Sequence, residues 1–202
     1  MKKYILPIFL LFSIFFMNSC SYMGLIPHGD IVINVITTKE TNEWEEKNES
    51  DKKYYAIYSN GIYQETDKFK ADDVNIYHVD PHETFLTEIV GNRIVNTVVK
   101  PTVTDNNNNL ITPDDNMINI INATANSIEH DIWKFEIFKD NNKYFAFIWL
   151  NVNWCSPCEL YEYDIDKKSI HQLCEWDEID IVGISVPDSI NNFSSDKLLS
   201  PL

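Results

Sequence analysis

Short runs of alternating or continuous apolar residues, separated by turn residues, recur along most of the chain and predict a protein built mainly from β-strands. The expected strands cover residues 31–37, 54–59, 62–66, 74–79, 84–90, 93–99, 132–138, 144–152, 159–165, 169–176 and 179–186. Asn60-Gly61 predicts a two-residue type I′ hairpin turn. Asp80–Glu83, Gly91-Asn92 and Asp166–Lys168 predict further turns between neighbouring strands.

One segment, near 113–128, has helical spacing instead. Thr112 is the expected capping residue, with Pro113 at the first helical position. Met117, Ile120 or Ile121, and then Ile128 follow at the intervals of one helix face. The expected fold class is therefore mainly β, an antiparallel meander or sandwich or a set of propeller-like sheets, with one short helix.

The propeller-like alternative is based on a faint similarity between two parts of the sequence. Lys53–Ile57 resembles Lys143–Phe147, and Ile76–Asp80 resembles Leu160–Asp164. The repeated order of two strands, a turn and a further strand resembles the blades of bacterial β-propellers. Blades of about 40–50 residues would fit about four times into the chain, whereas a sandwich explains the same strands without a closed ring.

The N-terminus has the three-part layout of a secretion signal. Lys2 and Lys3 precede an apolar run over 4–17, which is short for a permanent membrane span. The run ends at Met17-Asn18-Ser19-Cys20, which resembles the lipobox of bacterial lipoprotein precursors; Ser19 and Met17 match the pattern and Asn18 departs from it. The resemblance implies cleavage before Cys20 and attachment of acyl chains to that residue.

The expected organisation follows from this reading. Residues 1–19 are the signal peptide, 20–30 a lipid-anchored tether, 31–187 a β-rich globular domain and 188–202 a C-terminal tail. The expected location is the bacterial cell envelope, as a membrane-anchored lipoprotein. Ser21, which is not an aspartate, is compatible with the outer membrane if the organism has one.

Charge narrows the possible partners. The whole chain carries a net charge of −15, and removal of Lys2 and Lys3 with the signal leaves 14 − 31 = −17. Such a chain repels nucleic acid and anionic headgroups. We therefore expect no nucleic-acid partner, and we expect membrane contact through the acyl chains on Cys20.

The remaining cysteines are Cys155, Cys158 and Cys174. Trp154–Cys158 resembles the active-site string of thioredoxins, in which one thiolate attacks a disulfide and the second resolves the intermediate. In that family a helix follows the motif, whereas the alternating run at 159–165 predicts a strand. We therefore favour thiols or a disulfide over a redox site.

Two other arrangements of these cysteines are open. Cys158 and Cys174 lie on the two arms of one expected hairpin, with Cys174 opposite Leu160, so a disulfide is within reach. Alternatively Cys155, Cys158, His171 and Cys174 form a structural zinc site. His171 and Cys174 are three apart and would face opposite ways on a regular strand, so we expect no metal.

No Gly-rich phosphate loop, HExxH or GxSxG motif is present, and we expect neither a catalytic residue nor a cofactor. The expected function is a non-catalytic binding or scaffold domain of unknown partner, protein or glycan. The alternative is an envelope thiol–disulfide protein that uses Cys155 and Cys158.

Four tyrosines are expected in the sheet face and core, with a ligand-stacking platform as the alternative: Tyr54, Tyr58, Tyr161 and Tyr163.

Overall fold

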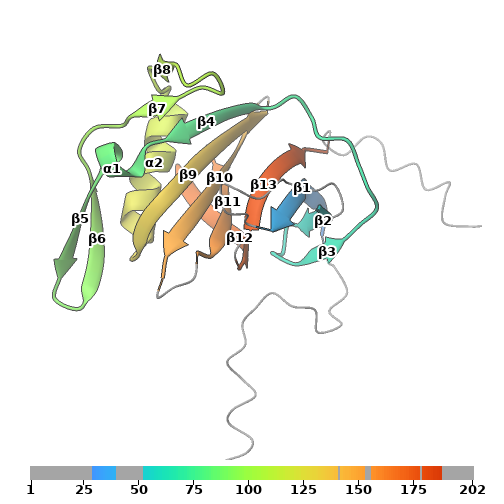
Figure 1. The fold of residues 1–202 in the computed structure, drawn as a ribbon, viewed down its shortest axis with the longest axis horizontal. Helices are drawn as coiled ribbons and strands as arrows, with labels where there is room; N and C mark the ends of the chain where they lie inside the picture. The colour runs from blue at the N-terminus through green and yellow to red at the C-terminus, as the bar shows by residue number, and fades with distance from the viewer. Residues whose placement is uncertain (1–28, 40–51, 141, 153–155, 178, 188–202) are drawn as a thin grey trace, which may run out of the picture.

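The computed structural model describes residues 29–39, 52–140, 142–152, 156–177 and 179–187 (Figure 1). The strands of this part of the chain form a seven-stranded sheet, a four-stranded sheet and a separate hairpin, all with antiparallel pairing. The large sheet has the order β12 (Ser169–Trp176), β11 (Cys158–Asp164), β10 (Lys143–Asn151), β9 (Asp131–Asp140), β4 (Asn75–Val79), β7 (Val103–Thr104) and β8 (Leu110–Ile111). The small sheet has the order β13 (Ile179–Ser185), β1 (Ile31–Lys39), β2 (Lys53–Tyr58) and β3 (Tyr63–Glu65).

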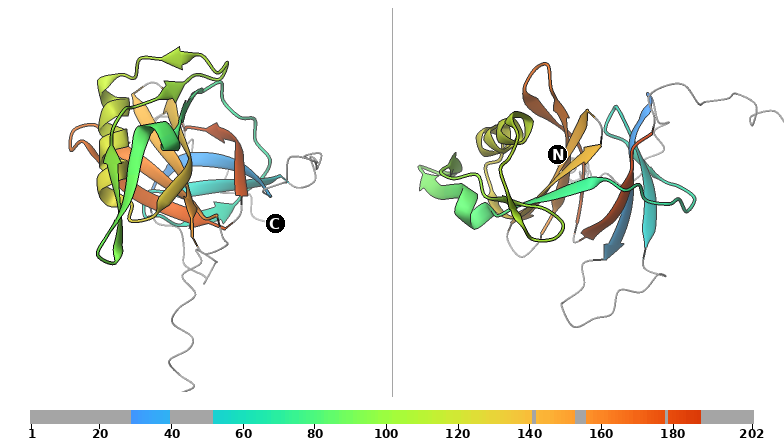
Figure 2. Two further views of the ribbon diagram at one scale, coloured as in Figure 1. Left: turned by 60° about the vertical axis from the view of Figure 1, so that its left-hand side comes forward. Right: turned by 90° about the horizontal axis from the view of Figure 1, so that it is seen from above.

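The hairpin pairs β5 (Phe85–Val90) with β6 (Arg93–Val98), and α1 (Pro81–Thr84) precedes it. The longer helix, α2 (Asp115–Ser127), lies on one face of the large sheet, and the small sheet covers the other face (Figure 2). The mainly β prediction with one helix near 113–128 is confirmed. The two sheets pack face to face, so the arrangement is a sandwich with an added helix. The two similar segments, which form β2 and β10, lie in different sheets.

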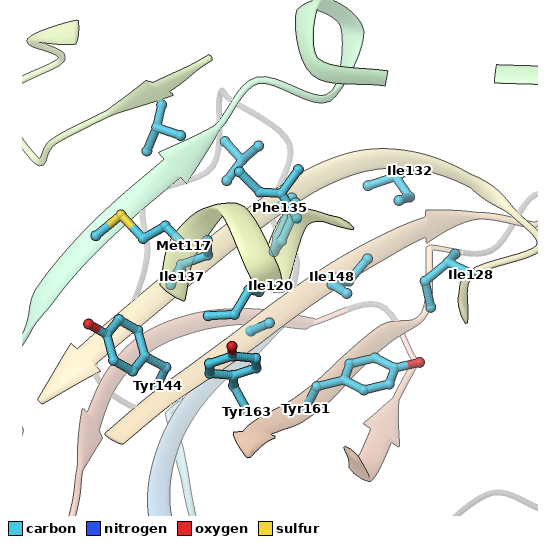
Figure 3. Packing of buried hydrophobic residues seen from close by; sticks show 14 of the residues in the cluster. Met117, Ile120, Ile128, Ile132, Phe135, Ile137, Tyr144, Ile148, Tyr161 and Tyr163 are labelled. Atoms are coloured by element: carbon cyan, nitrogen blue, oxygen red, sulfur yellow. The ribbon is translucent and has the colours of Figure 1, made fainter. Parts of the chain in front are cut away.

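The helix-side core fills the space between α2 and the large sheet (Figure 3). From α2 it receives Met117, Ile120 and Ile121, as the helical spacing predicts. The buried side chains of this core are Val79, Phe85, Val103, Met117, Ile120, Ile121, Ile128, Ile132, Phe135, Ile137, Tyr144, Ala146, Ile148, Leu150, Tyr161 and Tyr163. Because nucleation of an isolated helix of this length is unfavourable in water, this apolar contact is the main source of its stability.

The inter-sheet core fills the space between the two sheets. Its buried members are Val32, Ile33, Val35, Ile57, Phe138, Phe145, Phe147, Trp149, Cys158, Leu160, Leu173, Cys174, Trp176, Ile184 and Val186. Strand β10 contributes to both cores because successive residues of a strand point to opposite faces. Phe145, Phe147 and Trp149 enter the inter-sheet core, and each is fully buried. Burial of one such side chain stabilises the fold by about 1.5–3 kcal/mol.

Three local predictions are wrong in detail. Helix α2 is capped by Asp114, whose carboxylate accepts the Met117 N–H at 2.9 Å, and not by Thr112. The segment expected as a turn at 80–83 is instead capped by Asp80 and continues as the short helix α1. Both differences follow from carboxylates, which accept hydrogen bonds from the first N–H groups of a helix.

The third difference is the turn between β2 and β3. A type I′ turn needs two residues with positive φ, but only Gly61 has one, at +79°. Tyr58 N–H donates to the Ile62 carbonyl at 2.9 Å, and Gly61 N–H donates to the Tyr58 carbonyl at 2.9 Å. The loop is therefore three residues long, with a left-handed Gly61 at its end.

This turn lies against an irregularity in β12. Leu160 pairs with Cys174 and Tyr161 pairs with Gln172, so Leu173 is an extra, bulged residue. A Cβ atom added to Gly61 would lie 2.5 Å from the Leu173 carbonyl oxygen. The tip of the β2–β3 hairpin thus packs closely on the bulge of the neighbouring sheet.

The expected signal peptide 1–19, most of the tether and the tail 188–202 lie outside the described residues. The ranges that are described contain no helix long and apolar enough to cross a membrane.

Candidate functional site

The cysteines are only partly placed by the structure. Cys20 and Cys155 lie outside the described residues. Cys158 is the first residue of β11, and the prediction that a strand follows it is confirmed. Cys174 lies opposite Leu160, as predicted. Both side chains enter the inter-sheet core.

Cys158 and Cys174 are diagonal neighbours, because the residue directly opposite Cys158 is Trp176. Diagonal Cα atoms lie about 7–8 Å apart, beyond the usual disulfide span of 4.4–6.8 Å. The structure has no disulfide between these two cysteines. A bridge between them therefore needs local backbone movement, and their pairing stays a prediction.

The surroundings of Cys158 suppress thiolate chemistry. Burial raises the pKa of the Cys158 thiol well above its usual value, Lys134 opposes this shift, and Cys174 and two glutamates add to it. Since the thiolate is the reactive form, Cys158 is inert while the domain is folded.

The zinc arrangement is not assembled by the described residues. The bulge at Leu173 turns His171 to the same sheet face as Cys174, so the expectation of opposite faces is wrong. His171 is nevertheless exposed, opposite Glu162, whereas Cys174 is buried. No group of three or more potential His, Cys, Asp or Glu ligands occurs in the described part of the chain.

A charged cluster lies where the two sheets meet. His78 Nδ1 is 3.2 Å from Glu136 Oε1, and Lys134 Nζ is 3.5 Å from the same oxygen. Lys134 Nζ also lies 3.4 Å from Asp180 Oδ1 on β13 and 4.0 Å from the centre of the Trp149 ring. These contacts join β4 and β9 of the large sheet to the small sheet, so we assign the cluster a structural role.

The β5–β6 hairpin is the element that structural packing explains least. It extends beyond the large sheet, away from the small sheet (Figures 1 and 2). Phe85, at the base of the hairpin, is buried in the helix-side core. Asn96, which pairs with Thr87 halfway along the hairpin, donates its side-chain amide to the carbonyls of Ile128 and His130 at 2.9 and 3.0 Å. At the outer end, Arg93 Nη1 lies 3.3 Å from Glu129 Oε1, and both side chains are largely exposed.

Beyond this base the hairpin exposes large apolar side chains. Ile89 is 79% exposed and Val90 60% exposed, and the other exposed apolar residues of this segment are Leu86, Val95 and Val99. Because neighbouring residues of a strand point to opposite faces, Ile89 and Val90 make the outer half of the hairpin apolar on both sides. Exposed apolar side chains gathered on one hairpin favour this element as a candidate interaction site. We name residues 86–99 the apolar hairpin.

The sequence reading predicted this hairpin but not its exposure. Alternation of apolar and polar residues normally indicates one buried face. The available signal was the neighbouring pair Ile89-Val90 beside the tight Gly91-Asn92 turn, since neighbours on a strand cannot share one core face.

Of the four tyrosines considered for a ligand-stacking platform, Tyr161 and Tyr163 are buried in the helix-side core, so they do not form a ligand surface.

No protein-family model, no curated protein and no solved structure matches this chain.

Proposed function

We propose that this protein is a lipid-anchored component of the bacterial envelope whose β-rich domain binds a protein partner through the apolar hairpin, without catalysis. The observation that carries the binding proposal is the exposure of Ile89 and Val90 on opposite faces of a hairpin that leaves the body of the domain.

Energetics supports a binding role for this surface. Each exposed side chain of the Val or Ile type forgoes about 1.5–3 kcal/mol that burial would supply. An isolated two-stranded hairpin is only marginally stable in water and needs a third strand or a packed face. The inner part of this hairpin is fixed by Phe85 and Asn96, whereas its outer end contacts the body of the domain through the exposed pair of Arg93 Nη1 and Glu129 Oε1, 3.3 Å apart. A partner that covers the outer half would supply the missing burial.

Anchoring is proposed on the sequence around Cys20. In bacterial cells that express the full chain, a radiolabelled fatty acid should be incorporated, and Cys20→Ala should abolish the label. Ser21→Ala is the matched control, because it changes the neighbouring residue and keeps the thiol. Label that survives Cys20→Ala would contradict the anchor.

Binding is tested with a photo-crosslinking amino acid in the full chain. Position 89 on the apolar hairpin and position 110 on β8 carry apolar residues of similar exposure, 79% for Ile89 and 70% for Leu110. We expect one protein adduct from position 89 and no matching adduct from position 110. Equal adducts from both positions, or none from position 89, would contradict the binding role of the hairpin.

The thiol–disulfide alternative has less support, because Cys158 is buried and its pKa is raised. Reduction of a model disulfide by the full chain, lost in Cys155→Ala, would favour that alternative over ours.

A further inference from the structure

We infer that the partner binds by strand addition: an extended, apolar protein segment with a basic residue pairs with the outer edge of β5. This inference rests on the proposed binding role of the apolar hairpin and specifies how that surface is used.

The pairing of β5 with β6 determines which backbone groups of the hairpin point outward. Val90 pairs with Arg93 across a two-residue turn, so this pair exchanges backbone hydrogen bonds, and every second pair does likewise. The bond from Val99 N–H to the Thr84 carbonyl, 2.9 Å, fits the same alternation at the base. The backbone groups of Thr87 and Ile89 therefore point away from β6, toward solvent.

Among the described residues, no further strand pairs with this outer edge of β5. The outward N–H of Phe85 is used by α1, since it donates to the Pro81 carbonyl. Helix α2 packs against β6 and not against β5 among the principal contacts of the described elements. Thr87 and Ile89 thus present a short row of backbone donors and acceptors of the kind to which an added strand pairs.

The outward backbone groups restrict the chemistry of the occupant. A lipid phase would cover the apolar side chains but would leave these backbone groups without partners, which costs several kcal/mol per group. An added strand covers the side chains and pairs the backbone together. Glu88 is the only charged residue of β5, and the expected mature chain carries −17 (14 − 31). A basic residue opposite Glu88 is therefore favoured, and a second copy of this acidic chain is not.

The probe for the test is a synthetic peptide, Thr-Val-Thr-Lys-Thr-Val-Thr, added to the purified full chain. Amide hydrogen exchange should slow at Thr87 and Ile89, while Glu88 and Val90, already bonded to β6, change little. The same peptide with N-methylated backbone is the matched control and should give no protection. A peptide with Glu in place of Lys should bind about fivefold more weakly.

A second test uses the chain itself. Thr87→Pro removes one outward N–H and leaves the backbone hydrogen bonds between β5 and β6 intact. Thr87→Val is the control. Both variants lose the 2.8 Å hydrogen bond from Thr87 Oγ1 to Asn96, but only Thr87→Val keeps the backbone N–H. We expect Thr87→Pro, and not Thr87→Val, to abolish the position-89 adduct. The N-methylated peptide remains informative if Thr87→Pro unfolds the hairpin.

Three outcomes would overturn strand addition. Equal binding of the normal and N-methylated peptides would indicate contact through side chains alone. If neither peptide slows amide exchange at Thr87 and Ile89, strand pairing at the outer edge of β5 is excluded. An adduct at position 89 that consists of lipid or of a second copy would identify another occupant. In the first two cases a protein adduct at position 89 alone would still support the proposed function, so the two failures are distinguishable.

Discussion

Replacement of Gly61 by alanine tests the contact between the two sheets most directly. Gly61 ends the β2–β3 turn with φ of +79°, and its missing Cβ would lie 2.5 Å from the Leu173 carbonyl oxygen. The substitution therefore introduces two separate costs, one in the backbone of Gly61 itself and one against the bulge of β12.

The size of each cost can be estimated. A left-handed backbone costs an ordinary L-residue about 1–2 kcal/mol. A Cβ–O distance of 2.5 Å must lengthen by several tenths of an ångström, and forced backbone shifts of this kind cost about 1–3 kcal/mol. Gly61→Ala should therefore lower the free energy of unfolding by about 2–5 kcal/mol, a large share of the typical total of about 5–15 kcal/mol.

Urea denaturation followed by circular dichroism measures this loss as a lower midpoint at unchanged slope. Gly61→Asn separates the two costs, because Asn tolerates positive φ but carries the same Cβ; it should remain strongly destabilised. Gly91→Ala is the second control, since Gly91 has φ of +67° and open space around it. If Gly61→Asn is nearly as stable as the unaltered chain, the contact with Leu173 is not tight and the reasoning fails.

Three further predictions concern titratable groups. Burial alone would raise the pKa of Asp114, but the Met117 N–H and Lys139 lower it below 3.8. The stabilisation of the fold by the ionised carboxylate is therefore present above pH 3.8. It is lost as the pH falls through the lower pKa that Asp114 has in the folded state. Asp114→Ala should cost about 1 kcal/mol at neutral pH and Asp114→Asn less, because Asn can still cap α2; equal losses in urea denaturation would contradict the capping role. Burial, then the neighbouring Glu159, raises the pKa of Glu175 above 4.5, so its ionisation destabilises the fold as pH rises through this region. Glu175→Gln should therefore raise stability by about 0.3–0.5 kcal/mol at pH 7, and a gain that persists at pH 3 would refute the electrostatic cause. Cys158 should react with iodoacetamide only after unfolding, and site-resolved mass spectrometry that finds rapid native alkylation would refute its burial.

Sequence pattern was sufficient for most strands, because local rules determine them. The continuous apolar run of β10 indicates a strand buried on both faces, and it lies at the centre of the three layers. The end of α2 at Ser127 and its buried residues likewise follow from spacing. The pairing of β1 with β13 was not predictable, because no local signal links strands so far apart in sequence.

The candidate site was less predictable for the same reason. The alternating pattern of β5 resembles that of a half-buried strand, and only the position of the hairpin relative to α2 leaves Ile89 exposed. In the β11–β12 hairpin, the predicted three-residue turn would pair Ile165 with Ser169, but Asp164 pairs with Ser169 and the loop has four residues. Cys174 still lies opposite Leu160, because the bulge at Leu173 offsets this difference by one residue. The bulge lies against Gly61 of the other sheet, a contact between residues far apart in sequence.

The place of β1 between β2 and β13 has a consequence for the order of folding. Asn34 pairs with Ser185, so the small sheet is completed only after nearly the whole domain has left the ribosome. Until then the edge of β1 and the apolar face of the large sheet lack their cover. Contacts this distant in sequence slow folding. If the chain is exported by the signal segment that we propose, this delay would keep it extended long enough to pass through a translocation channel before the sandwich closes.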